Sequence, residues 1–175
     1  MTGIRVTERL DPHDTAEVLT LIATVTESDG MAPLSEHVLL HLRHGGDEGG
    51  RHFIATDDSN AMIGYAHLDS TDEVHGASAE LAVHPDHRRC GIGHQLVESL
   101  IGATAHERLR LWAHGEQAAA AAALARSFDF THSRVLWQMR RSLLAPLPDV
   151  VLPDGISMRT FVPGTDDVPW LDLNS

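Results

Sequence analysis

The sequence predicts an α/β domain in which helices cover both faces of a mixed, mostly antiparallel sheet of six or seven strands. Three observations lead to this fold class. Short segments alternate apolar and polar residues, as half-buried strands do, and turn residues separate them. Longer segments place apolar residues three and four positions apart, as amphipathic helices do. The early strands are joined by hairpin turns and the later ones by helices, which is typical of a mixed sheet covered by helices.

The N-terminal part of the chain reads as one strand and two helices. Residues 4–10 alternate as a strand does, and Asp14 and Glu17 have the spacing of a capping box for the helix that follows. Ser35 is placed to cap a second, shorter helix, which ends in the glycine-rich stretch 45–50, a predicted mobile loop. The apolar positions that fall on one face of the first helix are Val18, Leu21, Ile22 and Val25.

The remaining strands and helices follow from the same patterns. Residues 57–60 are turn formers between two strand-like segments, which predicts a hairpin. Pro85 ends a later strand ahead of a basic, glycine-bearing loop. Strands are predicted over 52–56, 61–68, 77–84, 109–113 and 135–140, and helices over 96–104 and 117–125.

Composition excludes several classes of function. The 175 residues carry 13 Lys and Arg against 25 Asp and Glu, a formal charge of −12, so the surface would repel nucleic acids and anionic membranes. No stretch reaches the roughly 18 apolar residues that cross a bilayer. The single cysteine, Cys90, allows neither an internal disulfide nor a Cys-rich metal cluster. Residues 1–10 lack a signal-peptide pattern, so we expect a cytoplasmic protein that binds no nucleic acid and no membrane.

The C-terminal part of the chain indicates a repeat. Residues 1–144 are expected to form one domain, 145–155 a Pro-rich linker, and 156–175 the truncated start of a second copy. A piece as short as the last cannot form such a domain alone, which predicts a missing partner domain. The matching positions, 152 residues apart, include Ile4 and Ile156, Val6 and Met158, Asp14 and Asp166, and Val18 and Trp170.

The loop that joins the strand 77–84 to the next helix has the chemistry of a pyrophosphate site. Gly91 and Gly93 allow backbone conformations that other residues resist. Backbone N–H groups of the loop can converge at the helix N-terminus, where the helix dipole favours an anion. Arg88 and Arg89 add positive charge to an otherwise acidic chain. The ordinary alternative is a strand-to-helix turn without a ligand, but the narrow sequence context favours a binding site.

At these residues the chain resembles the Gcn5-related N-acetyltransferase (GNAT) superfamily, because Arg88-x-x-Gly91-x-Gly93 matches its signature. The resemblance implies the GNAT fold and acetyl-CoA as co-substrate. It further implies that the strand backbone pairs with the pantetheine arm and that the loop holds the pyrophosphate. The implied strand residues are Leu81, Ala82 and Val83, and the implied loop residues are Arg88, Arg89, Cys90, Gly91, Ile92 and Gly93.

The tail resembles the opening of the second domain of the actinobacterial mycothiol synthase family, through residues 152–161, Pro163-Gly164 and Trp170-Leu171. That resemblance implies a tandem acetyltransferase, here its N-terminal half, which acetylates the cysteinyl amine of cysteinyl-glucosaminyl-inositol. It also implies an acidic acceptor-binding residue at Glu36, although a carboxylate in a first helical turn is equally well explained by the helix dipole.

The catalytic residues depart from the superfamily pattern. Glu80, directly before Leu81, is the candidate general base, and a salt-bridged strand residue is the alternative. The usual acid is a Tyr after the last long helix, but Ala125 stands in its place and Asp129 replaces the usual Gly. Two other functions therefore stay open: a non-catalytic acetyl-CoA-binding module, and an acetyltransferase that acts on another small amine.

Two further features are interpreted as structural. His37, His41 and His44 lie on one helical face, but no carboxylate or Cys completes a metal set, so we expect a solvated histidine-rich face and no metal. Cys90 could be an activated thiol at a helix start, but we expect it to contribute only its N–H.

Overall fold

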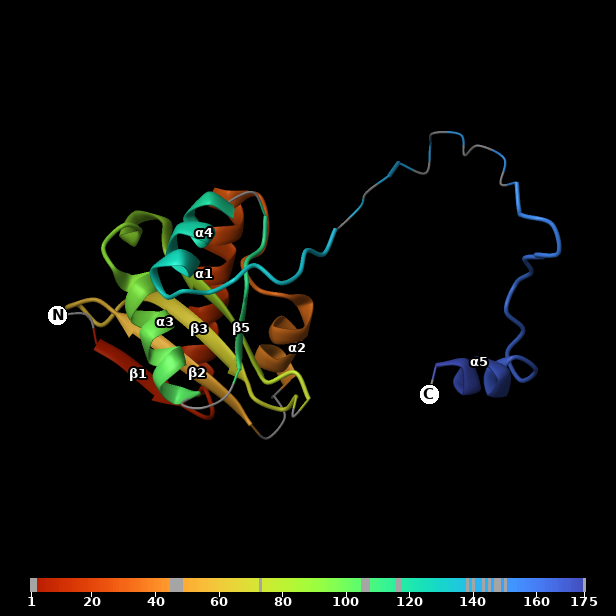
Figure 1. Ribbon diagram of the computed structural model, residues 1–175. Coiled ribbons are helices and arrows are strands. Elements are labelled where there is room, and N and C mark those ends of the chain that lie inside the picture. Colours follow the sequence, from red (N-terminus) through yellow and green to blue (C-terminus); the bar gives the residue numbers. More distant parts are fainter. Residues whose placement is uncertain are drawn as a thin grey trace. The chain divides into compact units, whose positions relative to one another are not determined.

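The computed structural model describes residues 3–44, 49–72, 74–104, 108–115, 118–137, 139, 141, 142, 144, 146, 149 and 151–174. The chain divides into two compact units, residues 1–133 and 134–175 (Figure 1). The elements of the first unit are β1 (Gly3–Thr7), α1 (Pro12–Asp29), α2 (Glu36–His44), β2 (Gly50–Thr56), β3 (Met62–Asp69), β4 (Ala77–Val83), the 3₁₀ helix η1 (Pro85–His87), α3 (Ile92–Ala103), β5 (Leu109–Trp112) and α4 (Ala118–Ser127).

The strands form one mixed sheet in the order β1-β2-β3-β4-β5. The first three pairings are antiparallel and the β4–β5 pairing is parallel, which confirms the predicted fold class. The described sheet has five strands, fewer than the predicted six or seven, because the described residues of the predicted strand 135–140 do not form a strand. Its described residues, 135–137 and 139, have irregular backbone and exposed side chains, because alternation produces a strand only where a neighbouring edge pairs with it.

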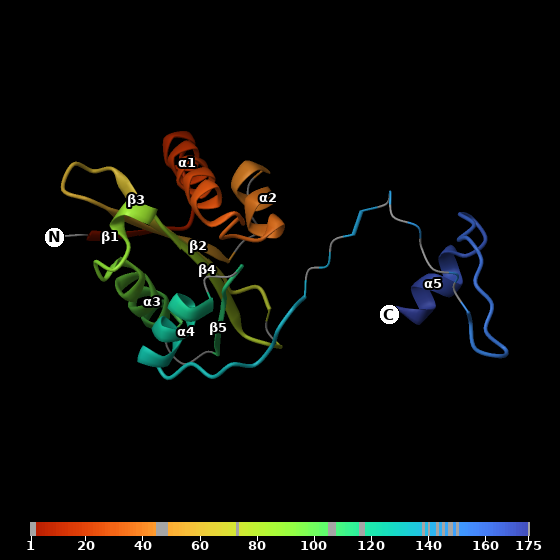
Figure 2. The same ribbon diagram turned by 90° about the horizontal axis from the view of Figure 1, so that it is seen from above.

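Helices cover both faces of the sheet, as predicted. Figure 2 shows α1 and α2 on one face and α3 and α4 on the other. The first face buries Ile54 and Tyr65 against α1 and α2, and the second buries Phe53 and Ala66 against α3. This division follows from the strand period of two, which turns successive side chains to opposite faces.

The start of α1 differs from the prediction. The cap is Asp11, whose side chain accepts a hydrogen bond from the Asp14 N–H at 2.8 Å, so Asp14 is not the capping residue. The Asp14 carboxylate instead accepts from the Arg5 guanidinium at 2.6 Å and ties β1 to the helix. Before α2, Ser35 Oγ accepts from the Val38 N–H at 3.5 Å, in the predicted capping position. Of the predicted mobile loop 45–50, residues 45–48 lie outside the described part of the chain.

Gly64 of β3 sets how closely α3 approaches the sheet. A Cβ atom at this position would lie 2.9 Å from Cγ2 of Ile92 and 3.3 Å from Cδ1 of Leu96. Ile92 is the first residue of α3, and both side chains are buried. The absence of a side chain at Gly64 therefore lets the start of α3, and the loop before it, lie close against β3.

The second unit contains one short helix, α5 (Asp167–Leu173), among its described residues. Arg159 donates two hydrogen bonds to the Asp166 carboxylate, at 2.5 and 2.6 Å. The apolar side chains of α5 are largely exposed, with Trp170 and Leu171 each 55% accessible. Across the described residues, the helices are all too short or too polar to traverse a lipid bilayer.

Candidate functional site

The parallel pairing of β4 with β5 ends inside β4. It runs from Ala77 opposite Leu109 to Glu80 opposite Trp112. Residues 81–83 continue to pair with β3 on the other edge, but the ladder to β5 has ended by then. Beyond Glu80 the described residues form no ladder with β5, so an extended ligand could add hydrogen bonds of the strand type to the peptide groups of 81–83 on that side.

The loop after β4 turns the chain into α3 through two left-handed residues. Arg89 has φ +63° and Gly91 has φ +85°, and Gly91 is the N-cap residue of α3 without a side-chain capping hydrogen bond. The first backbone bond of the helix runs from the Gln95 N–H to the Gly91 carbonyl. The N–H groups of residues 92–94 therefore precede the helical ladder and lie at the positive end of the helix dipole, which suits an anion.

The Arg88 side chain is part of the scaffold of this loop. Its guanidinium makes a two-pronged ion pair with Asp29 at 2.9 and 2.8 Å, and its Nε–H donates to the Val83 carbonyl at 3.2 Å. The guanidinium lowers the pKa of Asp29 below its ordinary value, against the opposing effect of burial. The positive charge that the sequence places at Arg88 is thus paired with the Asp29 carboxylate. Sequence reasoning missed Asp29, because nothing local links it to a residue 59 positions away.

The other predicted loop residues have distinct surroundings. Cys90 is exposed, and its thiol donates to the Arg88 carbonyl at 3.4 Å. Gly93 is an ordinary helical residue, because a Cβ there would only reach van der Waals contact, 3.5 Å from Cδ2 of Leu124. Of the two glycines, Gly91 is the one whose backbone conformation disfavours a side chain.

Glu80 lies on the sheet face that α1 and α2 cover and is 8% exposed. Its Oε2 accepts a hydrogen bond from the Ser35 N–H at 2.5 Å and lies 3.5 Å from Nε2 of His114. Burial raises the pKa of Glu80, but the nearby His114 ring and the Ser35 N–H outweigh it, so that this pKa lies below its ordinary value. A carboxylate held in its ionised form in this way is a weaker base, which favours the salt-bridged alternative.

A cluster of histidines lies between α2 and the sheet. His67 of β3 is buried, and burial together with His52 lowers its pKa to about 4. Of the predicted solvated face, only His37 and His44 are exposed, while the His41 ring contacts His67. We call the following four residues the histidine cluster: His37 and His41, with ring centroids 4.1 Å apart, His67, 6.2 Å from His41, and His52, 5.3 Å from His67.

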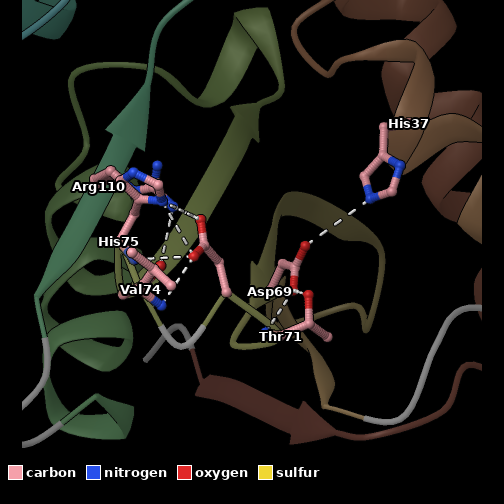
Figure 3. Close-up of polar contacts among 8 residues, drawn as sticks. His37, Asp69, Thr71, Val74, His75 and Arg110 are labelled. Carbon is pink, nitrogen blue, oxygen red and sulfur yellow. Dashed lines mark hydrogen bonds and ion pairs between the residues drawn. The ribbon is translucent and has the colours of Figure 1, made fainter. Parts of the chain in front are cut away.

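The outer edge of this cluster reaches Asp69, the last residue of β3. Nε2 of His37 lies 3.9 Å from the Asp69 carboxylate (Figure 3). Asp69 also accepts hydrogen bonds from the backbone N–H and hydroxyl of Thr71, at 2.8 and 2.7 Å. Further along, the Asp72 carboxylate accepts from Arg110 of β5 at 3.1 Å. The end of β3 thus contacts α2 through Asp69, and the segment after it contacts β5 through Asp72.

Glu36, Asp129 and Tyr65 lie in three different surroundings. Glu36 is exposed in the first turn of α2, directly after the Ser35 N–H that Glu80 holds. At the end of α4, Asp129 has φ +57°, the left-handed conformation that a glycine would adopt without strain. Asp129 therefore adopts the backbone conformation that suits the Gly implied at this position by the resemblance, although Ala125 stands in place of the implied tyrosine. Tyr65 is fully buried, and its hydroxyl lies 2.7 Å from Nδ1 of His52.

Comparisons with known proteins find acetyltransferases of the GNAT type. Residues 48–132 match the family model described as acetyltransferase (GNAT) domain. The structure resembles a GCN5-related N-acetyltransferase from Sphaerobacter thermophilus, with a TM-score of 0.70 and 26% identity over 98% of this chain and 56% of that chain. An aminoglycoside acetyltransferase from a soil metagenomic sample shares the fold, with a TM-score of 0.56 and 19% identity over 81% of this chain and 96% of that chain.

Curated relatives extend the similarity beyond the fold. A protein named mycothiol acetyltransferase from Acidothermus cellulolyticus is 49% identical to this chain, and the alignment spans 100% of this chain and 55% of that protein. Another protein of that name, from Streptosporangium roseum, is 51% identical to this chain, and the alignment spans 95% of this chain and 49% of that protein. The chain thus spans about half the length of the curated relatives that it matches.

Proposed function

Because this chain belongs to the GNAT acetyltransferase family, we propose that it is the acetyl-CoA-binding N-terminal half of a mycothiol acetyltransferase. The observation that carries the proposal is that two features occur together. Residues 81–83 lie beyond the end of the β4–β5 ladder, and the N–H groups of residues 92–94 start a helix that has no side-chain cap. One suits an extended amide arm and the other suits a pyrophosphate. Both adjoin the same end of β4.

Acetyl-CoA would bind along this path. Backbone groups of Leu81, Ala82 and Val83 would pair with the pantetheine arm. The pyrophosphate would accept hydrogen bonds from backbone N–H groups of the loop. Arg89 would supply the positive charge, because the Arg88 guanidinium is already ion-paired with Asp29. The backbone N–H donors are proposed from Arg89, Cys90, Gly91, Ile92 and Gly93, since the Arg88 N–H already donates to the Pro85 carbonyl at 3.3 Å.

The reaction proposed for the whole protein is transfer of the acetyl group to an amine. The amine nitrogen loses a proton and attacks the thioester carbonyl, the C–S bond breaks, and coenzyme A leaves as a thiol once its thiolate is protonated. Relatives of this chain carry the name mycothiol acetyltransferase, which supports cysteinyl-glucosaminyl-inositol as acceptor. Glu36 is the proposed acceptor contact, and a second GNAT domain beyond residue 175 is the proposed partner. The single, exposed thiol fits a cytoplasmic location.

A second candidate function is a non-catalytic acetyl-CoA-binding module. It is favoured by Ala125, which occupies the place of the usual acid, and by the engagement of Glu80 with Ser35. Both functions require acetyl-CoA binding, and they differ in turnover.

The test is a calorimetric titration of this chain with acetyl-CoA, alongside an assay for thiol release in the presence of cysteinyl-glucosaminyl-inositol. We expect binding, and its absence would overturn the proposed function. Binding without thiol release would identify the non-catalytic module. Binding with release only when other small amines replace this acceptor would show a different acetyltransferase.

A further inference from the structure

The segment between α1 and α2 is held at both ends by β4 and its loop. We call residues 30–35 the α1–α2 connector. Asp29, directly before the connector, is ion-paired with Arg88 of the loop. Ser35, at its end, donates its N–H to Glu80 of β4. Two fastenings therefore join the connector to the strand and loop of the proposed acetyl-CoA site.

The first fastening is partly shielded from solvent. The Arg88 and Asp29 side chains are 31% and 14% exposed, and two parallel N–H···O bonds fix the orientation of both groups. Arg88 also holds the Val83 carbonyl, the last peptide of β4. A ligand that fixes the backbone of this loop therefore fixes the position of Asp29 as well.

The second fastening acts on the start of α2. Glu80 is buried, and its carboxylate takes an N–H that precedes the helical ladder, a favourable place for negative charge. Leu34, the residue before Ser35, is 2% exposed and lies in the core. The next residue along the chain is Glu36, so the position of Glu36 depends on the contact between Glu80 and Ser35.

We propose that the α1–α2 connector couples the acetyl-CoA site to Glu36, with Asp29 and Glu80 as positioning residues. This inference rests on the proposed function and assigns Glu80 a role other than general base. Acetyl-CoA orders the loop, the Arg88–Asp29 pair transmits that order to the connector, and the Glu80–Ser35 contact holds α2 in place. Because coupling is reciprocal, an occupant beside Glu36 also strengthens acetyl-CoA binding.

The test uses amide hydrogen exchange of residues 34–40, with and without saturating acetyl-CoA. In the unchanged chain we expect acetyl-CoA to slow this exchange by about fivefold or more. In Asp29→Asn we expect acetyl-CoA affinity to fall about tenfold and the slowing at 34–40 to disappear even at saturation. Glu98→Gln removes a carboxylate from the exposed face of α3 and is the matched control, with both properties unchanged.

Glu80 is tested by two variants. Glu80→Ala is expected to speed exchange at 34–40 about tenfold without ligand, while exchange in β2 and β3 stays unchanged. Glu80→Gln retains an oxygen that can accept from Ser35 and is expected to restore most of the protection, a rescue that loss of general stability would not show. Equal effects of the two variants, or uniform changes across the sheet, would overturn the positioning role.

The outcomes separate this inference from the proposed function. If the unchanged chain fails to bind acetyl-CoA, the proposed function fails, and the ligand-free comparison of the Glu80 variants still decides whether this residue holds α2. If acetyl-CoA binds but exchange at 34–40 does not respond, the coupling is wrong and the binding site stands.

Discussion

The loop after β4 and the polar groups beneath α2 both adjoin β4, but they are built in different ways. The loop is one continuous run, residues 84–93, and what it offers a ligand is mainly backbone N–H groups at a helix start. The groups beneath α2 are side chains from four elements, namely His41, His52, His67 and Glu80. The first site is set by local conformation, and the second exists only when the sheet is assembled.

This difference predicts how each region responds to change. A backbone site tolerates most side-chain replacements and fails when its conformation or charge is altered. A cluster of buried titratable groups responds to protons, because burial penalises the charged form of each ring. Ligand affinity is therefore the sensitive measurement for the loop, and the pH dependence of stability is the sensitive measurement for the histidine cluster.

The largest effect is expected at Gly91. Replacement by Glu puts a side chain on a residue with φ +85° and a carboxylate next to the proposed pyrophosphate position. We expect acetyl-CoA affinity to fall at least about a thousandfold, or roughly 4 kcal/mol, measured by calorimetric titration. Gly91→Asn is the control, because Asn tolerates the left-handed conformation and carries no charge. Unchanged affinity in Gly91→Glu would remove the loop from the binding site.

The sequence predicted the loop well for a physical reason. The glycine that must adopt a positive φ, the basic residues and the helix that follows are all neighbours along the chain, so the spacing of Arg88 and Gly91 carries the information. The paired strands and the two helix-covered faces were equally readable, because alternation and helical spacing are local. The strand predicted over 135–140 was not confirmed, since pairing depends on an edge that alternation does not specify.

The long-range contacts could not be read from the sequence. Arg88 was expected to add positive charge to the loop, and its ion pair with Asp29, 59 positions away, could not be foreseen. Glu80 was considered as a base, and its partner Ser35 lies 45 positions away. The histidine predicted to be solvated at position 41 meets the His67 ring of β3, which in turn meets the His52 ring of β2, and only the folded sheet sets that register. The domain boundaries 144 and 155 and the site assignments stay predictions.

The second effect concerns the histidine cluster and pH. Burial keeps His67 neutral in the folded protein with a pKa of about 4, against about 6.5 when unfolded. Between these values the unfolded chain binds more protons at this ring, so the contribution of His67 to stability is fully present above pH 6.5 and is lost as the pH drops toward 4, by up to about 3 kcal/mol. The groups that act on His67 are His41, His52, Asp69 and Glu80.

Urea unfolding between pH 4 and pH 7.5 measures this dependence. His67→Gln is expected to reduce the slope of the profile between pH 4 and pH 6.5, because no proton is then taken up at this position on unfolding; His52, Asp29 and Glu80, whose pKa values are also lowered, keep part of the slope. His44→Gln, at an exposed position of α2, is the matched control and keeps the slope of the unchanged protein. An equally steep profile in His67→Gln would show that the buried ring does not cause the pH dependence.

The third effect concerns the packing of α3, the helix that follows the loop, against β3. Gly64→Ala puts a Cβ 2.9 Å from Ile92, so α3 must shift, and we expect a loss of about 2 kcal/mol in the free energy of unfolding. Because Ile92 follows the loop directly, acetyl-CoA affinity should fall by about threefold as well. Gly102→Ala is the control, since it adds a methyl group to the same helix with no atom within 4 Å and should stabilise the protein by up to about 1 kcal/mol. Undiminished stability in Gly64→Ala would mean that the start of α3 is free to move.

The smallest effect is expected at Cys90, which tests whether the loop acts through its backbone. The thiol is exposed and contacts only the Arg88 carbonyl among the hydrogen bonds of the described residues. Cys90→Ser keeps a donor of similar size and leaves the N–H in place, so acetyl-CoA affinity should stay within about twofold of the unchanged chain. Titration of both proteins under reducing conditions measures this. A tenfold or larger loss would show that the sulfur itself takes part, and the loop would then resemble the region beneath α2 in acting through a side chain.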